Sequence, residues 1–380
     1  MILLDRKAKS QVQSRLVPNK VVVLLGPRRV GKTVLLDQIM AEIEEAYLLL
    51  SGEDFEVISM LENRSVQNYK RILGNVKFLI IDEAQEIPDI GAKLKLMVDH
   101  IEGIRILITG SSAFDIENST GEPLTGRKNT LRLFALSEQE LNQVENIIEK
   151  RSNLKNRLVF GNYPELIHLT GNKEKADYLS EIINSYLLKD ILAFETIRNS
   201  DKIISLLRLV AFQVGGEVSL QELGGQLSMS KNTVEKYLDL LSKVFVIHRV
   251  GGFSRNLRKE VTKNSKWYFH DNGIRNLLTA NVNPIETRDD VGQLWENYII
   301  SERLKVQSYD KMIVNNYFWR TYDQQEIDWV EDRGGKLYGY EFKWSPKKNV
   351  KIPVAWRKSY PSAEFQVINR ENYLDWIIDQ

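Results

Sequence analysis

The chain has 380 residues, 43% of them apolar and 27% charged, which is typical of a soluble globular protein with more than one domain. Its 52 basic and 51 acidic residues leave a net charge of +1, so overall charge does not indicate a nucleic-acid partner. Cysteine is absent, which excludes disulfides, thiolate zinc sites and iron–sulfur clusters. The N-terminus lacks a signal-peptide pattern and no apolar run approaches the ~20 residues of a membrane span, so we expect a cytoplasmic protein without membrane contact.

Strands and helices alternate over the first third of the chain. Continuous runs of apolar residues predict strands buried on both faces of a sheet, and apolar positions at helical spacing predict the connecting helices. This alternation predicts an α/β domain with a parallel sheet and helices on both faces. The expected strands are 21–25, 47–50, 76–81 and 104–109, and the expected helices are 33–46 and 94–101.

A phosphate-binding loop follows the first expected strand and opens the first expected helix. Its pattern is Gly-x-x-x-x-Gly-Lys-Thr over residues 26–33. The glycines let backbone N–H groups face a phosphate, and the helix N-terminus adds its positive dipole. In this pattern Lys32 reaches the β- and γ-phosphates and the Thr33 hydroxyl binds magnesium. The expected nucleotide-binding residues are Gly26, Pro27, Arg28, Arg29, Val30, Gly31, Lys32, Thr33 and Val34.

Two carboxylates end the strand expected at 76–81. Ligands of open α/β sheets bind at the carboxyl ends of the strands, which is where Asp82 and Glu83 stand. Asp82 is expected to hold magnesium through its water shell, and Glu83 to orient or deprotonate the attacking water. A pair of solvated acids at the start of a loop is the alternative for this dipeptide taken alone.

Two further positions suit phosphate chemistry. Ser111 follows the strand expected at 104–109, where a hydroxyl could sense the γ-phosphate or the water, although a plain turn explains it equally. Arg127 could act as an arginine finger, which accelerates hydrolysis by about 10³- to 10⁵-fold where one exists. An exposed loop arginine is the competing interpretation, because loops are usually charged.

These segments together resemble a large bacterial and archaeal family of AAA-type ATPases that carry a C-terminal domain of unknown function. The resemblance rests on residues 26–33, Ile-Asp-Glu-Ala-Gln at 81–85, Ile-Thr-Gly-Ser-Ser at 108–112 and Leu-Thr-Gly-Arg at 124–127. It implies ATP and Mg²⁺ as cofactors and gives Ser111 the sensor position. Arg127 falls on the family's recurring Gly-Arg, and a finger from a neighbouring subunit would require a homo-oligomer.

A helix-turn-helix pattern occupies the middle of the chain. Ser219 is placed to cap a helix over 220–227, and Ser230 to cap a second helix that ends at Leu241. A strand over 244–250 then begins a wing, so this segment resembles the winged helix of the same family. Residues 249–266 carry six basic residues and one acid, a local excess that suits DNA phosphates. Outward charges on the second helix are mixed, so packing against a protein remains the alternative to DNA.

Near the C-terminus, two strands expected at 326–330 and 337–344 are joined through two glycines. Their alternation lets Asp328, Glu341 and Lys343 converge, which resembles the PD-(D/E)XK nuclease superfamily. The resemblance makes Glu296, on a helix expected over 292–304, an additional acid. Carboxylates bind magnesium and a lysine helps to activate a water, but a salt-bridged hairpin without nuclease activity remains an alternative.

The sequence therefore predicts an ATPase whose C-terminal parts act on DNA. The alternative is an ATP-dependent molecular switch whose C-terminal parts bind a protein partner and have no nuclease activity. The expected domains are an AAA-type ATPase over 1–136, a helical lid or linker over 137–198, a winged helix over 199–265 and a nuclease-like α/β domain over 266–380. Within the lid or linker, long helical stretches are expected over 137–150 and 176–194.

Overall fold

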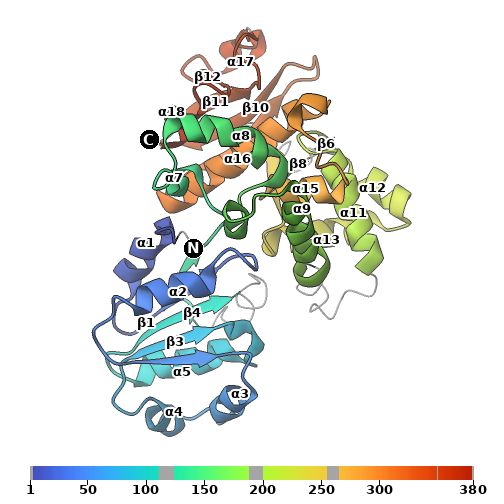
Figure 1. Cartoon of the computed structure of the whole chain (residues 1–380). Coiled ribbons are helices and arrows are strands. Elements are labelled where there is room, and N and C mark those ends of the chain that lie inside the picture. Colours follow the sequence, from blue (N-terminus) through green and yellow to red (C-terminus); the bar gives the residue numbers. More distant parts are fainter. Residues whose placement is uncertain (1–2, 111–123, 188–199, 255–264, 349, 379–380) are drawn as a thin grey trace. The chain divides into compact units, whose positions relative to one another are not determined.

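A computed structural model describes residues 3–110, 124–187, 200–254, 265–348 and 350–378 (Figure 1). The chain divides into two compact units. The unit that contains the predicted ATPase domain, the ATPase unit, comprises Leu3–Phe134 with Lys243–Phe245, and the C-terminal unit comprises the described residues of Ala135–Ser242 and Val246–Gln380. No helix among the described residues has both the length and the apolar character that crossing a membrane requires.

The ATPase unit contains a five-stranded sheet in which every neighbouring pair is parallel, in the order β2-β3-β4-β1-β5. Helices α1 and α2 lie over one face and α5 over the other (Figure 1). The predicted parallel α/β architecture is confirmed. Its strands are β1 (Lys20–Leu25), β2 (Tyr47–Ser51), β3 (Phe78–Asp82), β4 (Arg105–Gly110) and β5 (Lys128–Arg132); its helices are α1 (Lys7–Arg15), α2 (Lys32–Met40), α3 (Phe55–Glu62), α4 (Val66–Leu73), the 3₁₀ turn η1 (Ala84–Glu86) and α5 (Ile90–His100).

The central strands of the sheet are largely apolar and buried, so they hold the loops at their ends in fixed positions. Val21–Leu25 of β1 is buried throughout, and the first four residues of β3 are buried as well. The register pairs Leu25 with Gly110, so β1 and β4 end at the same edge. The loop after β1 and the carboxylates at the end of β3 therefore stand along one edge of the sheet.

The C-terminal unit is built on a seven-stranded mixed sheet in the order β12-β11-β10-β9-β7-β8-β6. Its strands are β6 (Glu217–Val218), β7 (Ile247–Gly252), β8 (Ser265–Phe269), β9 (Asn315–Arg320), β10 (Glu326–Arg333), β11 (Lys336–Phe342) and β12 (Glu364–Ile368). Its helices are α7 (Glu138–Leu141), α8 (Ile147–Phe160), α9 (Asn172–Glu181), α11 (Ser200–Phe212), α12 (Leu220–Leu227), α13 (Lys231–Lys243), α15 (Asn272–Leu278), α16 (Val291–Tyr309), α17 (Val354–Ser359) and α18 (Tyr373–Ile378). Shorter turns are η3 (Pro164–Ile167), the π-helix η4 (Ile182–Leu187) and η5 (Ile285–Thr287).

One continuous sheet crosses the boundary predicted at residue 265. Strands β7 and β8 pair as an antiparallel hairpin, and β7 also pairs in parallel with β9 through Gly251 and Gly252. The segments that the sequence predicts as a winged helix and as a nuclease-like domain consequently share hydrogen-bonded strands. They are parts of one compact unit.

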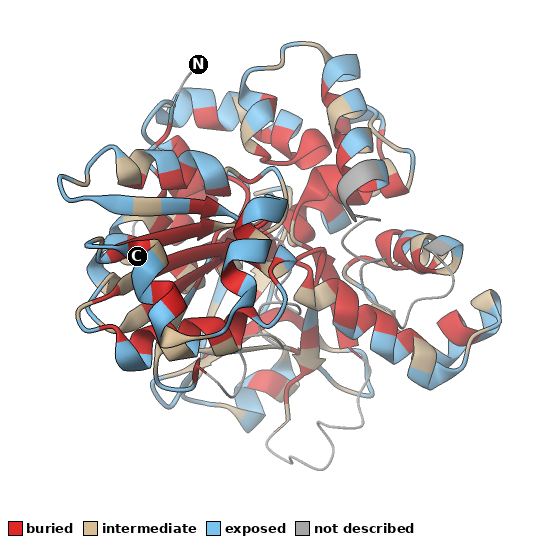
Figure 2. Ribbon diagram, turned by 90° about the horizontal axis from the view of Figure 1, so that it is seen from below, coloured by how far each residue is buried: buried red, intermediate tan, exposed pale blue. Residues whose placement is uncertain are grey.

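Three expected helices have different limits. The helix expected over 33–46 ends at Met40. The helical stretch expected over 137–150 is two helices, because Asn146 accepts hydrogen bonds from the N–H groups of Ile148 and Glu149 and so begins α8. The long helix expected over 176–194 is α9 followed by the π-helix η4, and its last residues lie outside the described ranges. Figure 2 shows the resulting helices with buried and exposed residues alternating along them.

Candidate functional site

The loop between β1 and α2 has a backbone that depends on its glycines. Gly31 has a φ of +93°, in the left-handed region that favours glycine. A Cβ on Gly26 would overlap the carbonyl oxygen of Leu133, so the loop begins in close contact with the chain after β5. Val30 is fully buried and fixes the centre of the loop. The residues at 26–33 therefore take a single compact turn at the N-terminus of α2.

Lys32 is buried, and its ammonium lies over this loop. Its Nζ donates to the carbonyl oxygens of Gly26 and Pro27, at 3.1 Å each. The same Nζ is 3.9 Å from Oε1 of Glu83, so the loop lysine and the second carboxylate face each other. The structure thus brings these two predicted residues together from neighbouring parts of one sheet edge.

Thr33 and Asp82 are in direct contact. The Thr33 hydroxyl donates to Oδ2 of Asp82 at 3.0 Å, and the Thr109 hydroxyl donates to Oδ1 of the same carboxylate. A hydroxyl and a carboxylate held side by side are oxygen ligands of the kind that Mg²⁺ uses, with waters and phosphates completing its octahedron. The pair therefore fits the magnesium role predicted for it.

Glu83 has a strained backbone. Its φ of +50° is uncommon for a residue with a side chain and costs about 1–3 kcal/mol. The Glu83 N–H donates to the Thr109 hydroxyl at 3.1 Å, and a Cβ on Gly52 would overlap the Glu83 carbonyl oxygen. Gln85 donates from Nε2 to Oε2 of Glu83 at 2.5 Å. Several neighbours therefore fix the carboxylate in place, as a water-orienting acid requires.

Arg127 stands at the other edge of the sheet. It precedes β5, and its carbonyl oxygen accepts from the N–H of Val21 at the start of β1, whereas the phosphate loop follows the end of β1. Its side chain is paired with Asp99. The structure does not bring Arg127 to the phosphate loop of its own chain. Ser111, the expected sensor, lies outside the described residues.

Three residues contribute to the site beyond those that the sequence predicts. Thr109 ends an expected strand, and a threonine in that place beside an acidic pair is a signal for such a contact. Gln85 belongs to the motif at 81–85 but has no expected role of its own. Arg6, which contacts the loop through Val30, has no local pattern that would identify it.

A second polar cluster, in the C-terminal unit, brings together three of the four predicted nuclease-like residues. Lys343 Nζ is 2.6 Å from Oε1 of Glu341 and 3.6 Å from Oδ2 of Asp328. Asp328 also accepts from the N–H of Phe342 at 2.8 Å. Burial, followed by the charge of Asp328, raises the pKa of Glu341. Burial alone would lower the pKa of Lys343, but the two carboxylates hold it above its usual value.

Glu296 joins this cluster from α16 with a partner that the sequence did not indicate. Its Oε1 accepts from the Tyr268 hydroxyl at 2.6 Å and is 3.8 Å from Nζ of Lys266. Burial, with the nearby Asp328 charge, raises the pKa of Glu296 to about 8. Among the described residues, no three or more His, Cys, Asp or Glu side chains are arranged to hold a metal ion. The cluster is therefore a set of carboxylates partly neutralised by lysines.

Lys266 departs from the expected basic surface. It is one of the six basic residues of 249–266, yet its side chain is 3% exposed and pairs with Glu326 and Glu296. Arg249 remains exposed, donating from Nε to the Ser265 hydroxyl at 2.9 Å. The other four basic residues of the stretch, Arg255, Arg258, Lys259 and Lys263, lie outside the described ranges.

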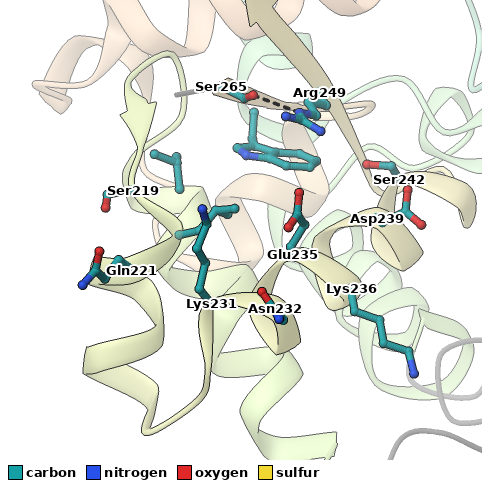
Figure 3. Close-up of a pocket in the computed structure, with 13 residues that line it drawn as sticks. Ser219, Gln221, Lys231, Asn232, Glu235, Lys236, Asp239, Ser242, Arg249 and Ser265 are labelled. Atoms are coloured by element: carbon teal, nitrogen blue, oxygen red, sulfur yellow. Dashed lines mark hydrogen bonds between the residues drawn. The ribbon is translucent and has the colours of Figure 1, made fainter. Parts of the chain in front are cut away.

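An open groove of about 750 Å³ lies between α13, the start of α12 and strands β7 and β8 (Figure 3). Its polar wall carries both signs of charge. Glu235 extends into the groove toward the strand that bears Arg249, whereas Lys236 extends away from it. The charged lining residues are Lys231, Glu235, Lys236, Asp239 and Arg249.

Comparison with known families assigns three parts of the chain. Residues 18–142 match a family described as an AAA domain, residues 151–285 match a domain of unknown function (DUF8612), and residues 291–375 match another (DUF4143). The five-stranded parallel sheet and the loop at 26–33 belong to the first match. The chain therefore contains an AAA-type P-loop ATPase domain over residues 18–142 and a DUF4143 domain near its C-terminus.

Relatives cover most of the chain. An uncharacterised protein of Mycobacterium tuberculosis is 25% identical over 348 residues, which are 90% of this chain and 74% of the relative. An uncharacterised protein of Haemophilus influenzae is 22% identical and covers 94% of both chains. Among solved structures, a Walker-type ATPase of Pyrococcus abyssi aligns with a TM-score of 0.52 at 16% identity, over 72% of this chain and 95% of that one. This last likeness supports the fold.

Proposed function

We propose that this chain hydrolyses ATP with Mg²⁺ and uses the hydrolysis to control a C-terminal unit that acts on DNA. Residues 26–34 bind the nucleotide, with Lys32 on the β- and γ-phosphates. Thr33 and Asp82 hold magnesium, which neutralises phosphate charge, and Glu83 orients the water. The convergence of these four side chains at one edge of the parallel sheet supports this proposal.

Two features support DNA as the target. The order α11, β6, α12, α13, β7 and β8 is that of a winged helix, with Ser219 and Ser230 at the starts of α12 and α13. Residues 255–264 also add four basic residues and one acid to the hairpin between β7 and β8. A positively charged wing suits phosphates, and such contacts make affinity depend on salt.

The rate of ATP turnover should depend on DNA. We expect double- or single-stranded DNA to stimulate hydrolysis, and the variant Arg255→Ala/Arg258→Ala to lose most of this stimulation while retaining basal turnover. Each lost phosphate contact should also lower the slope of log affinity against log salt by about one. A matched control is Lys155→Ala/Lys336→Ala, which removes the same charge from exposed ion pairs with Glu286 and Glu364. A rate of ATP hydrolysis that is the same with and without DNA would contradict the DNA role but not the proposed ATPase activity.

A second function, favoured by the mixed charge of the groove in Figure 3, is an ATP-dependent switch that binds protein. Glu235 and Asp239 would repel a DNA backbone, whereas a protein partner supplies both signs of charge. The burial of Lys266 also reduces the positive surface available to DNA. In this function the cluster around Lys343 is structural.

The variant Lys343→Ala separates these functions. If the unit cleaves DNA, we expect Mg²⁺- or Mn²⁺-dependent cleavage to be lost in this variant, because it removes the ammonium beside Asp328 and Glu341. ATP turnover should be unchanged, and Lys336→Ala, at the start of strand β11, which ends just before Lys343, is the control. Cleavage that persists in the variant would place the activity elsewhere. The absence of cleavage from both proteins would favour the protein-binding switch.

A further inference from the structure

Arg6 is a buried residue directly before α1, and its guanidinium joins two distant parts of the ATPase unit. One nitrogen, Nη1, donates to the carbonyl oxygen of Val30 at 2.6 Å. The other, Nη2, donates to the carbonyl oxygen of Phe134 at 2.6 Å. The side chain is largely shielded from water, since the residue is 6% exposed. Charge-assisted bonds of this kind are short and strong, and their loss leaves buried carbonyl groups without a donor.

The bond to Val30 bears directly on nucleotide binding. The Val30 carbonyl and the Gly31 N–H belong to one planar trans peptide, so they point in opposite directions. When Arg6 holds the carbonyl on one side, the Gly31 N–H is turned to the other side. A hydrogen bond at the carbonyl also polarises the N–H of the same peptide and strengthens it as a donor. Arg6 thereby sets the direction and strength of a donor in the phosphate loop.

The bond to Phe134 reaches the end of the ATPase unit. Leu133, its neighbour, donates to the carbonyl of Leu25, and its own carbonyl lies against Gly26. Both the beginning and the centre of the phosphate loop are thus fixed to residues 133–134. The next residue, Ala135, already belongs to the C-terminal unit.

The chain is fixed again as soon as it enters the C-terminal unit. Leu136 donates from its N–H to the carbonyl of Asn162 at 2.9 Å, and its own carbonyl accepts from Nζ of Lys305 at 2.9 Å. Ser137 then caps α7 with a reciprocal bond to Glu140, and all of these groups are buried. Only Ala135 separates Phe134, whose carbonyl is bonded to Arg6, from Leu136, whose N–H and carbonyl are both hydrogen-bonded.

We propose that Arg6 is a positioning residue of the ATP site, and that through Phe134 it transmits the state of the phosphate loop to the C-terminal unit. A triphosphate that engages the Gly31 N–H orders the peptide held by Arg6. The same guanidinium holds the carbonyl of Phe134, so a change at the phosphate loop alters the position of Phe134. Ala135 alone joins Phe134 to Leu136, and this short link transmits the change to the C-terminal unit. This inference rests on the proposed binding of ATP by residues 26–34.

The test of positioning is nucleotide affinity in Arg6→Met and Arg6→Lys, measured with a fluorescent ATP analogue and Mg²⁺ well below the unfolding temperature. We expect Arg6→Met to weaken binding about tenfold or more, because it removes two charged donors. Arg6→Lys keeps the charge but not the fork that reaches both carbonyls, so it should fall between Arg6→Met and the parent. Lys9→Met, on the helix that follows Arg6 and in surface ion pairs with Asp5 and Glu42, should bind like the parent.

Failure of the proposed function and failure of the positioning role give different results. If the parent protein bound no ATP, the proposed function would fail. If the parent bound ATP and a folded Arg6→Met bound it equally well, only the positioning role would fail, and a lower melting temperature in that variant would then mark Arg6 as structural. Should Arg6→Met not fold, the affinity of Arg6→Lys decides in the same way.

Transmission has its own readout, which is amide hydrogen exchange over 135–141 with and without a saturating non-hydrolysable ATP analogue. We expect the analogue to alter exchange in the parent and in Lys9→Met. At a concentration that saturates Arg6→Met, or Arg6→Lys if only that variant folds, the change should be absent or much reduced. Exchange in the parent that does not respond to nucleotide would overturn the transmission, as would an equal response in the variant.

Discussion

Replacing Glu83 with glutamine is expected to lower kcat for ATP hydrolysis about 10²- to 10³-fold while leaving ATP affinity within a few-fold of the parent. Glutamine keeps the size of the side chain and an oxygen that accepts from Gln85, so the local geometry should persist. It cannot take a proton from the attacking water. Steady-state turnover combined with direct measurement of ATP binding separates the two effects.

A carboxylate remote from the phosphate loop supplies the control for Glu83. Glu102, exposed after α5 in the same unit, stands before β4 at the opposite edge of the sheet. The variant Glu102→Gln should hydrolyse ATP at the parental rate. If Glu83→Gln also did so, the water would have to be oriented by another group, and the strain stored at residue 83 would need a different explanation.

The sequence predicts the ATPase fold well because its central strands are continuous apolar runs that are buried on both faces. These runs predict β1 to β4, whereas β5 was not predicted, because its only buried residue is Leu131 and it contains no apolar run. Helix limits are less predictable, since apolar spacing continues past the residues where caps act. Asn146 with Glu149 forms a capping box, and this sequence pattern marks the residue at which α8 begins after α7.

Some residues of the candidate site are likewise predictable from local sequence, and others are not. Lys32, Thr33, Asp82 and Glu83 are recognisable because loop and strand motifs fix their local backbone. Arg6 and Thr109 act through contacts with residues far along the chain, which depend on the completed fold. The count of basic residues also gives a wrong expectation for Lys266. Side chains alternate between the two faces of β8, and Lys266 lies on the face toward Glu296 and Glu326 instead of on the expected basic surface.

Replacing Lys32 with alanine is expected to weaken ATP binding on the order of 100-fold or more, and turnover at ordinary ATP concentrations should disappear with it. The ammonium would face the β- and γ-phosphates in a buried position, where few waters replace it. It also donates to the carbonyls of Gly26 and Pro27, so its loss leaves the loop less ordered before nucleotide arrives.

A second lysine of the same unit distinguishes this effect from a general loss of charge. Lys20 is the first residue of β1 and lies at the edge of the sheet opposite the phosphate loop, where its ammonium donates to the carbonyl of Gly126. Lys20→Ala should bind ATP like the parent by equilibrium titration with Mg²⁺. Parental affinity in a folded Lys32→Ala would mean that the triphosphate lies elsewhere. Equal losses in both variants would mean that charge over the whole unit, and not contact with the phosphates, governs binding.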